Sequence, residues 1–343
     1  MHIHTLIIGA GPGGLACAKI LAEQGVETLV LERKKRIGPK VCAGGITWSG
    51  LIKRVPEKLA EKSFPEQYIS TPWQKIRIQE KEPIIATINR ETLGHHMAEQ
   101  ALNAGAQIRT GVIVRKIDDG AVLVQNKNNN SQETISFDYL VGADGSSSLV
   151  RRSLGLASER LGIGINYQVP GDIKQMEWHL DSHLFANGYA WIFPHKKAVS
   201  IGAYADKRAM GPGNLKKNLI NWADRQGFNL KKHSAKAEYI NYDFQGWNFG
   251  RTFLVGDAAG LASGLTGEGI YPAIISAEHV AQTIITPEYS GKAMEILIRN
   301  HDKHSRMVTL TGKNRFLNSI LAELVTLGLR SGMIKFNKLE MAV

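Results

Sequence analysis

The chain has 343 residues, a length typical of one large domain or of two interlocked ones. Apolar residues make up 43% and charged residues 21%, which excludes disordered and collagen-like chains. The net charge of +11 is compatible with anionic partners such as phosphates, nucleic acid or a lipid surface, and selects none of them. Two cysteines exclude a disulfide framework, and no long charge-free apolar run predicts a spanning helix or a signal peptide. We expect a soluble, cytoplasmic protein.

The first thirty-two residues predict a strand–helix–strand unit. Residues 5–8 have the apolar pattern of a buried strand, residues 15–24 form an Ala- and Leu-rich helix, and residues 27–31 form a second strand. Both strands are apolar almost throughout, as in a parallel sheet that is covered on both faces. The sequence therefore predicts the first βαβ unit of an α/β fold.

The turn between this strand and this helix carries a glycine fingerprint. Its spacing is Gly-x-Gly-x-x-Gly, formed by Gly9, Gly11 and Gly14, with Gly13 inside it. The first glycine permits a tight turn, the second lets backbone approach a pyrophosphate, and the third lets helix and strand pack closely. The helix N-terminus presents N–H groups to the anion, and Glu32 at the end of the next strand would accept ribose hydroxyls. We predict a dinucleotide site here, with the adjoining Arg33 among its residues.

The remaining elements indicate two interlocked domains. A long basic, Gly-rich loop (33–50) is followed by a helix (90–104) and by strands at 108–117, 122–125 and 135–141. Short alternating runs at 164–169, 176–180, 189–193 and 198–204 predict a mostly antiparallel sheet, interrupted by a helix at 213–226. A strand at 252–255, a long helix from 267 and further helices from 287 complete the chain.

We therefore predict an α/β fold, α+β overall. A Rossmann-like domain with a parallel sheet comprises residues 1–70, 88–158 and 250–290. An inserted substrate domain comprises 71–87 and 159–249, and C-terminal helices occupy 291–343.

Two later strand ends repeat a Gly–Asp pattern. Residues 140–145 end with Asp144 followed by Gly145, and residues 253–260 contain Gly256 and Asp257. The second strand end leads through a loop into a helix, and the cofactor-binding candidates of this loop are Gly267, Gly269 and Ile270. An Asp just past a strand can hold a sugar-alcohol hydroxyl, and a helix N-terminus can stabilise negative charge on a reduced flavin ring.

These three motifs, in this order, resemble the FAD-dependent family with the para-hydroxybenzoate hydroxylase fold. The resemblance covers about residues 1 to 280 and implies that the fingerprint and Glu32 bind the ADP half of FAD. It also implies that the Asp144 element touches FAD and that the Gly256–Asp257 element binds the ribityl-pyrophosphate region. Arg90, at a predicted helix start, matches the family's Arg that reaches FAD, and we count Val112 with these cofactor-binding residues.

Two segments are similar to the geranylgeranyl reductase family in particular. Residues 40–46 resemble that family's Cys-x-Gly-Gly loop, which lies against the flavin and here contains Cys42, Ala43 and Gly44. Residues 189–194 resemble its Tyr-x-Trp-x-Phe-Pro motif, although Ala186 stands where that family usually has Pro. The resemblance implies Cys42, Tyr189 and Trp191 as catalytic residues.

Simpler interpretations of these segments remain open. The three alternating aromatics would form an apolar wall suited to an isoprenoid chain, or they would only pack the core of the sheet. Cys42 lies near Lys40, which favours a reactive or flavin-contacting thiol over a merely buried one. Cys17, on the first helix, is expected to be a buried apolar residue.

The resemblance implies an FAD-dependent oxidoreductase that reduces C=C double bonds of an isoprenoid-like substrate by hydride transfer from reduced flavin. A flavin monooxygenase or halogenase on the same fold, or a flavin-bound lipid-binding protein without turnover, remains an alternative. A halogenase would have Trp-x-Trp-x-Ile-Pro where Tyr189 and Phe193 stand here. No metal site and no nucleic-acid module are expected. The electron donor, NAD(P)H or a ferredoxin, and the oligomeric state are not indicated.

The C-terminal segment predicts a basic amphipathic helix. From Phe316 to Ile334 apolar residues recur largely at three- and four-residue spacings, and Arg315, Arg330 and Lys335 flank them. Such a helix either lies at a membrane interface, as a peripheral contact, or packs over the substrate domain.

Overall fold

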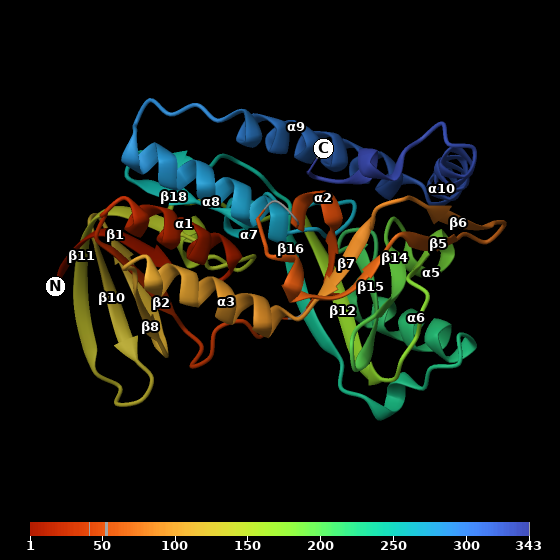
Figure 1. Ribbon diagram of the computed structural model, residues 1–343, viewed down its shortest axis with the longest axis horizontal. Helices are drawn as coiled ribbons and strands as arrows, with labels where there is room; N and C mark the ends of the chain where they lie inside the picture. The colour runs from red at the N-terminus through yellow and green to blue at the C-terminus, as the bar shows by residue number, and fades with distance from the viewer. Residues whose placement is uncertain (41, 52–53, 343) are drawn as a thin grey trace.

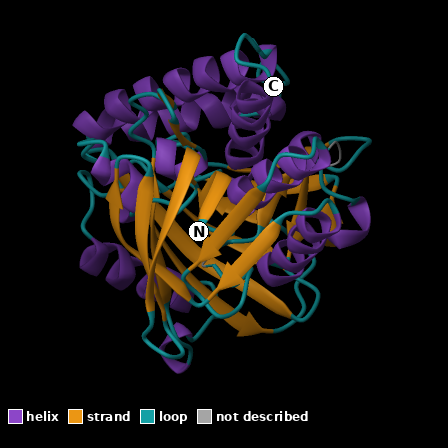
Figure 2. Ribbon diagram, turned by 90° about the vertical axis from the view of Figure 1, so that its left-hand side faces the viewer, coloured by secondary structure: helices purple, strands orange, loops and turns teal. Residues whose placement is uncertain are grey.

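The computed structural model describes residues 1–40, 42–51 and 54–342, so Val41 of the predicted Cys-x-Gly-Gly segment lies outside the described residues. The chain forms two lobes side by side, with α8 (Ile270–Ile285) and α9 (Lys292–Lys313) running along one side of both (Figure 1). Figure 2 shows the strands of the sheets gathered beneath these helices. The predicted fold class is confirmed.

The first lobe contains an eight-stranded sheet with a parallel centre. Its main path is β17-β18-β11-β1-β2-β8, and β9 and β10 extend it antiparallel from β11. Along β1, Ile7 packs beneath the helices while Leu6 and Ile8 pack on the opposite face, which explains why this strand is apolar throughout. The strands are β1 (His2–Ile8), β2 (Thr28–Glu32), β8 (Gln107–Thr110), β9 (Val112–Asp118), β10 (Ala121–Asn126), β11 (Gln132–Gly142), β17 (Asn248–Phe249) and β18 (Thr252–Leu254).

Helices cover this sheet and bring the ends of its parallel strands to one edge. The helices α1 (Pro12–Glu23), α3 (Arg90–Asn103) and α8 share one hydrophobic core with the sheet. Because β1, β2, β11 and β18 run parallel, the loops that follow them meet at their carboxyl ends. These loops carry the glycine fingerprint, Glu32, Asp144 and the Gly256–Asp257 pair, in that strand order.

The second lobe is a seven-stranded, mostly antiparallel sheet in the order β16-β12-β15-β14-β13-β5-β6. One face packs against α5 (Ser182–Phe185) and α6 (Pro212–Arg225), and the other faces the first lobe. The strands are β5 (Glu66–Ser70), β6 (Lys75–Gln79), β12 (Leu161–Pro170), β13 (Glu177–His179), β14 (Tyr189–Pro194), β15 (Ala198–Asp206) and β16 (Lys236–Asn241).

The chain between the basic loop and α3 differs from the sequence prediction, which identified no strands there. The basic loop ends in β3 (Gly45–Thr47) and α2 (Trp48–Leu51), and β3 joins β4 (Ala60–Phe64) and β7 (Ile85–Ile88) in a small third sheet. The division placed at residue 70 runs between β5 and β6, which are paired antiparallel in the second-lobe sheet. The strands β3 and β4 are short and pair with β7 rather than with each other, and β5 and β6 form a hairpin of mixed polar and apolar residues. The local sequence pattern therefore does not reveal these strands. The strand predicted over 108–117 is also divided, at Gly111, whose φ of +72° turns the chain from β8 into β9.

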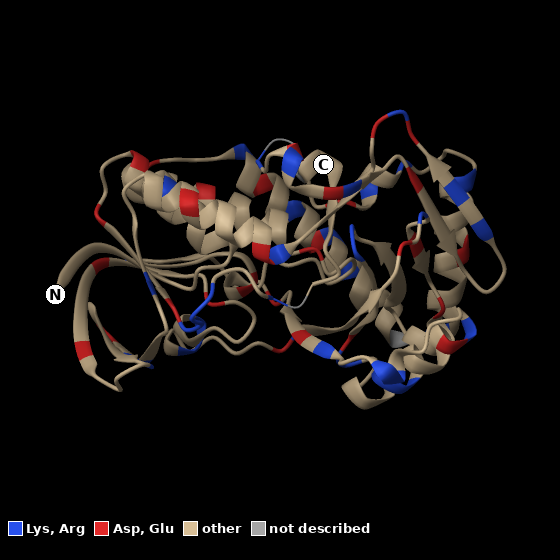
Figure 3. Ribbon diagram, turned by 60° about the horizontal axis from the view of Figure 1, so that its bottom comes forward, with Lys and Arg blue, Asp and Glu red and all other residues tan. Residues whose placement is uncertain are grey.

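The C-terminal helices are α9, α10 (Arg315–Arg330) and the short 3₁₀ helix η3 (Phe336–Leu339). Within the described ranges, no helix is both long and apolar enough to cross a membrane. Lys and Arg are interspersed with Asp and Glu over both lobes in Figure 3. The excess positive charge is therefore distributed over the molecule rather than concentrated in one lobe.

Candidate functional site

A cavity of about 860 Å³ lies where the two lobes meet. Polar loops of the first lobe line one part, and aromatic and aliphatic side chains of β14, α9 and α10 line the other. The structure thus brings together motifs that are separated by up to 260 positions in the sequence. The predicted site residues that line this cavity are Gly9, Gly11, Gly13, Glu32, Arg33, Cys42, Ala43, Arg90, Val112, Asp144, Tyr189, Trp191, Gly256, Asp257, Gly267, Gly269 and Ile270.

The other two predicted residues, Gly14 and Gly44, lie just behind the cavity wall, where close packing requires glycine. A Cβ at Gly14 would stand 1.9 Å from the Gly9 carbonyl oxygen. A Cβ at Gly44, whose φ is +83°, would stand 2.4 Å from Cε1 of His195. Both glycines therefore shape the loops that line the cavity.

The fingerprint turn leaves open space at one glycine. Gly11 is the N-cap of α1, and a Cβ there would meet the Ala143 carbonyl oxygen at 4.0 Å, an ordinary contact distance. No side chain caps α1, so its first N–H groups are available to an anion in the cavity. This arrangement fits a pyrophosphate cradle.

Glu32 is held rigidly at the carboxyl end of β2. Its Oε2 accepts a hydrogen bond from the Ala10 N–H at 2.9 Å, and its Oε1 accepts one from the Lys34 N–H at 2.8 Å. The carboxylate therefore lies beside the fingerprint turn with acceptor capacity remaining, as a ribose-binding group requires.

Four residues that line the cavity have a buried side-chain polar atom with no partner among the described residues, and two of these atoms belong to predicted site residues. One is Nε of Arg90, the first residue of α3, and the other is Oδ1 of Asp144. The second carboxylate oxygen of Asp144 accepts from the N–H of Leu149 at 2.6 Å, so Asp144 also fixes the start of α4 (Leu149–Ser153). Burial raises the pKa of Asp144. An unpaired donor and an unpaired acceptor beside one cavity fit a polar ligand there.

Asp257 stands at the start of the short helix α7 (Gly256–Ala259). Its Oδ2 accepts from Nζ of Lys40 at 3.1 Å and from Oγ of Ser146 at 3.0 Å. A Cβ at Gly269, the N-cap of α8, would stand 3.0 Å from Oδ1 of Asp257. The carboxylate and the α8 N-terminus therefore face the same part of the cavity.

The segment after Cys42 is fixed by side chains that the sequence does not single out. Asn166, in β12, donates from Nδ2 to the Cys42 carbonyl oxygen at 3.1 Å and accepts from Oγ of Ser200 at 2.8 Å. Ser200 in turn accepts from Nε1 of Trp191 at 3.0 Å. Asn166 and Ser200 are both buried. The indole of Trp191 is thus connected to the Cys42 backbone through two hydrogen-bonded side chains.

His195 fixes the next residue of this segment. Its Nε2 donates to the Ala43 carbonyl oxygen at 2.9 Å, while its Nδ1 lies 2.5 Å from Oε2 of Glu61. These two contacts hold the imidazole between the Glu61 carboxylate and the Ala43 carbonyl oxygen. An indication in the sequence is that His195 directly follows the Tyr-x-Trp-x-Phe-Pro motif.

The two cysteines differ in their surroundings. Cys17 is fully buried in the core beneath α1, and burial raises the pKa of its thiol. Cys42 is half-buried and lines the cavity, and its Sγ accepts from the Gly44 N–H at 3.3 Å. Only Cys42 is therefore placed to contact a molecule in the cavity.

The aromatic residues of β14 lie on one face of the strand, as predicted. Tyr189, Trp191 and Phe193 face the cavity, while Ala190 and Ile192 pack on the opposite side against the core beneath α6. Trp178 adds to this wall, with ring centroids 5.0 Å from Tyr189 and 4.9 Å from Phe193.

Two tyrosine hydroxyls join this wall to the loop before α8. The Tyr189 hydroxyl donates to the Thr266 carbonyl oxygen at 2.5 Å, and the Tyr204 hydroxyl donates to that of Gly264 at 2.7 Å. Burial raises the pKa of both phenols. The two hydroxyls position the loop through these hydrogen bonds, and the tyrosine rings present an apolar face to the cavity.

Two carboxyls that were not predicted line the cavity, and of these Glu340 is buried and Glu268 is half-buried. Glu268 accepts from Oγ1 of Thr47 at 3.3 Å and from the Met341 N–H at 3.3 Å, and Glu340 accepts from Oγ of Ser49 at 2.5 Å. Burial, reinforced for Glu268 by the nearby Glu340, raises the pKa of each to about 7. Glu268 lies within a Gly-rich motif, but Glu340 is seventy-two positions away, so the pair becomes visible only in the fold.

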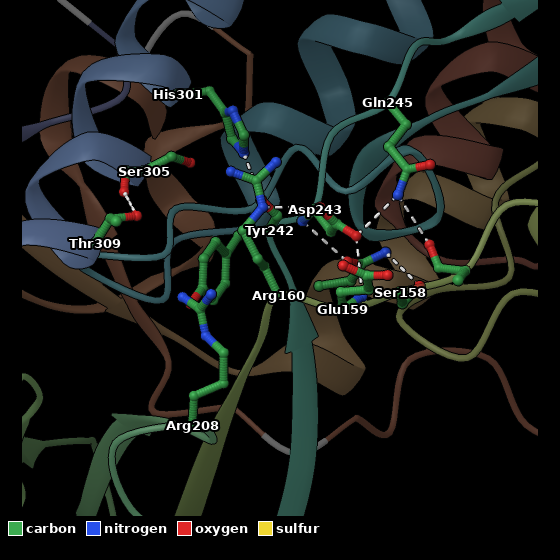
Figure 4. Close-up of polar contacts among 12 residues, drawn as sticks. Ser158, Glu159, Arg160, Arg208, Tyr242, Asp243, Gln245, His301, Ser305 and Thr309 are labelled. Carbon is green, nitrogen blue, oxygen red and sulfur yellow. Dashed lines mark hydrogen bonds and ion pairs between the residues drawn. The ribbon is translucent and has the colours of Figure 1, made fainter. Parts of the chain in front are cut away.

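The histidines of α9 belong to a structural junction outside the cavity. Within the described residues no group of His, Cys, Asp and Glu could hold a metal ion. Asp243 accepts from the Glu159 N–H at 2.9 Å and from Nε of Arg160 at 2.8 Å, and His301 contacts the Tyr242 carbonyl oxygen at 3.1 Å (Figure 4). This cluster attaches α9 to the end of β16.

Comparison with known proteins gives a family match over most of the chain. The profile of the FAD binding domain family matches residues 2–310. An uncharacterized protein of Methanosarcina barkeri is 30% identical over 298 residues, covering 84% of this chain and 76% of that protein. A protein of Methanosphaera stadtmanae named digeranylgeranylglycerophospholipid reductase 2 is 28% identical over 334 residues, covering 87% of this chain and 83% of its own.

Solved structures extend the similarity to the whole fold. A geranylgeranyl bacteriochlorophyll reductase-like protein of Thermoplasma acidophilum has a TM-score of 0.82 at 21% identity and covers 99% of this chain and 95% of its own. A myxobacterial chondrochloren halogenase has a TM-score of 0.65 at 16% identity, with 88% and 78% covered. At these identities the two similarities establish a common fold and leave the activity open.

Proposed function

Because the chain belongs to the FAD binding domain family, we propose that it is an FAD-dependent oxidoreductase that reduces C=C double bonds of an isoprenoid or similarly apolar substrate. The observation that carries the proposal is the single cavity that joins the fingerprint turn to the aromatic wall of β14. The Cys42 segment lies between these two parts. Relatives of the chain that are named as reductases of geranylgeranyl compounds support the same substrate class.

The polar part of the cavity is where we place the cofactor. The α1 N-terminus and the open space at Gly11 would receive the pyrophosphate, and Glu32 would accept the ribose hydroxyls. Arg90 and Asp257 would bind further polar groups of FAD. When bound and reduced by its electron donor, FAD would supply the hydride to one alkene carbon, and a proton would be added to the other. We propose that FAD is reduced by an electron donor of one of two classes, NAD(P)H or a ferredoxin.

The apolar part is where we place the substrate. The rings of Tyr189, Trp191 and Phe193 exclude water and align an extended hydrocarbon chain. Cys42 would contact the reacting region, since its half-buried thiol lies between the two parts of the cavity. The hydrogen bonds from Asn166 and His195 fix the backbone carbonyls of Cys42 and of Ala43, the residue that follows it. Both cysteines are free, which fits the cytoplasmic location that we propose.

The experiment that tests this function separates it from its two alternatives. The purified protein is reconstituted with FAD, reduced with dithionite under anaerobic conditions and mixed with geranylgeranyl diphosphate. A reductase reoxidises its flavin without oxygen and yields a product heavier by two hydrogens per double bond. Reoxidation that requires oxygen and adds an oxygen atom or a halogen to the product would instead establish a monooxygenase or halogenase. FAD binding without any turnover, together with co-purifying lipid, would establish a lipid-binding protein.

A further inference from the structure

An exposed apolar surface covers the outside of the C-terminal helices. We call it the apolar helix surface, and its residues are Trp73, Leu310, Phe316, Leu317, Leu324, Leu327 and Met333. Three of them are almost fully exposed: Met333 at 78%, Phe316 at 72% and Trp73 at 71%. A group of large apolar side chains exposed on neighbouring elements marks an interaction surface rather than a random exposure.

A buried carboxylate holds the separate pieces of this surface together. Glu323, in α10, accepts from Oγ1 of Thr71 at 2.8 Å, from Nε2 of Gln74 at 2.7 Å and from the Trp73 N–H at 3.3 Å. These three residues form the turn between β5 and β6, which lies against α10 (Figure 1). The turn is therefore fixed to the helix, with the indole of Trp73 directed outward.

The same helices also form the wall of the cavity. On α10, Leu321, Val325 and Leu329 line the cavity, whereas Leu324 and Leu327 face solvent. A helix that is apolar on both faces is not explained by packing over its own core, which requires one apolar face. On α9, Leu310 both lines the cavity and is 58% exposed, so the cavity reaches the surface at this point.

The exposed charges of the C-terminal segment that carries most of this surface have one sign. Of the residues from 307 to 342, the two acidic ones are Glu323 and Glu340, and both are buried. Arg315, Arg330, Lys335 and Lys338 are all exposed. Exposed apolar residues with a basic border match the interface of a bilayer that contains anionic lipids, and an exposed Trp is typical of such interfaces.

We infer that the apolar helix surface docks on an anionic lipid bilayer, with the apolar part of the cavity opening toward the lipid. This inference rests on the proposed function, because an isoprenoid substrate dissolves in a bilayer and would enter the cavity between α9 and α10. The sequence allowed two interpretations of the C-terminal segment, membrane contact or packing over the substrate domain. In this inference the outer face of α10 contacts the membrane, and its inner face forms the wall of the cavity.

Flotation with lipid vesicles tests the inference without any turnover. FAD-loaded protein should float with vesicles of phosphatidylcholine and phosphatidylglycerol and much less with phosphatidylcholine alone, and added salt should weaken binding. The double variant Phe316→Glu, Leu324→Glu should bind at least about tenfold more weakly, since burying two such side chains contributes more than 1.4 kcal/mol. The matched control is Leu102→Glu, Ile296→Glu, which changes the charge equally at exposed sites outside the surface and should bind like wild type.

Fluorescence gives the orientation independently. Of the six tryptophans, all within the described part of the chain, Trp73 alone is exposed, so brominated lipids should quench emission in wild type and much less in Trp73→Phe. No binding to anionic vesicles at low salt, or equal binding by both double variants, would overturn the inference. A dimer that the Phe316→Glu, Leu324→Glu pair dissociates, without vesicle binding, would also overturn it and assign the surface to a second copy. Vesicle binding without reduction of detergent-solubilised substrate would overturn only the proposed function.

Discussion

Substitutions at two glycines of the fingerprint should have different effects, one on the fold and the other on cofactor binding. Gly14 packs against the backbone, because a Cβ there would stand 1.9 Å from the Gly9 carbonyl oxygen. Gly11 has a φ of −79°, which any residue adopts, and a Cβ there would meet the protein first at 4.0 Å. Gly14→Ala should therefore damage the fold, whereas Gly11→Val should leave the fold intact and occupy the space that we assign to the pyrophosphate.

The magnitudes follow from these contacts. In Gly14→Ala the overlap is with backbone, which cannot rotate away, so we expect a loss of about 3 kcal/mol or more in unfolding free energy. In Gly11→Val the folded protein should lose only about 1 kcal/mol, the cost of an apolar residue at an N-cap. Displacing the pyrophosphate from even one charged hydrogen bond costs about 1.5–3 kcal/mol, which corresponds to a ten- to hundredfold weaker FAD affinity.

Flavin content and thermal unfolding measured on the same samples separate the two effects. Flavin is released and quantified against protein, and unfolding is followed on FAD-free protein so that cofactor loss does not affect the comparison. Gly11→Val should unfold close to the wild-type temperature and retain little FAD. Full FAD binding by Gly11→Val would refute the assignment of this turn to the pyrophosphate, and wild-type stability of Gly14→Ala would refute the packing argument.

Four further substitutions, one of them a control, test the second half of the site and the backbone before β14. Cys42→Ala should retain FAD but lower the rate of substrate reduction, whereas Cys17→Ala should leave both flavin content and rate unchanged. Equal rates in the two variants would mean that Cys42 only packs and does not act on the substrate. Asn166→Ala removes a hydrogen-bond partner of the buried Ser200. It should lower the unfolding free energy, measured by urea denaturation, by about 1–3 kcal/mol. An unchanged unfolding free energy would mean that water replaces the amide. Ala186 has a φ of +52°, so Ala186→Gly should raise the unfolding free energy by about 1 kcal/mol or more, and a lower unfolding free energy would contradict this backbone conformation.

The sequence predicted the elements whose signals are local. The βαβ unit, the helix at 90–103 and the strand ends with Asp144 and Asp257 each lie within short segments that have their own periodicity and turn residues. Ala186 illustrates a departure from the family pattern that the structure explains. Proline, whose φ is fixed near −65°, could not adopt the φ of +52° found there.

The residues that sequence reasoning missed acquire their roles through distant partners. Asn166 is one of two amide residues in the mostly apolar strand β12, and only the fold brings its side chain to the Cys42 backbone, 124 positions away. Glu61 lies in a segment without clear periodicity, 134 positions before its partner His195. A pattern read along one strand gives the face on which a side chain lies, but not what the opposite element places against it.

The raised pKa of Glu268 predicts the direction in which the unfolding free energy changes with pH. Burial raises the pKa of this carboxyl from 4.5 to about 7, so the folded state holds a proton that the unfolded state has released. The associated stability is fully present below pH 4.5 and is lost as the pH rises toward 7, by about 3 kcal/mol at most, since one pKa unit corresponds to 1.36 kcal/mol. His301 and His304 act in the opposite direction, because their lowered pKa values reduce stability as the pH falls below 6.5.

Comparing Glu268→Gln with wild type removes the histidine contribution, which both proteins share. Glutamine resembles the protonated acid and cannot ionise, so the unfolding free energy of the variant minus that of wild type should increase from pH 5 to pH 7 and then level off. Chemical denaturation at several pH values measures this difference, with Glu288→Gln, at an exposed position, as the control that should show no trend. A difference that is constant between pH 5 and pH 8, or that decreases, would mean that Glu268 is ionised in the folded protein at neutral pH. Its carboxyl would then place a negative charge, rather than a proton, at the wall of the cavity.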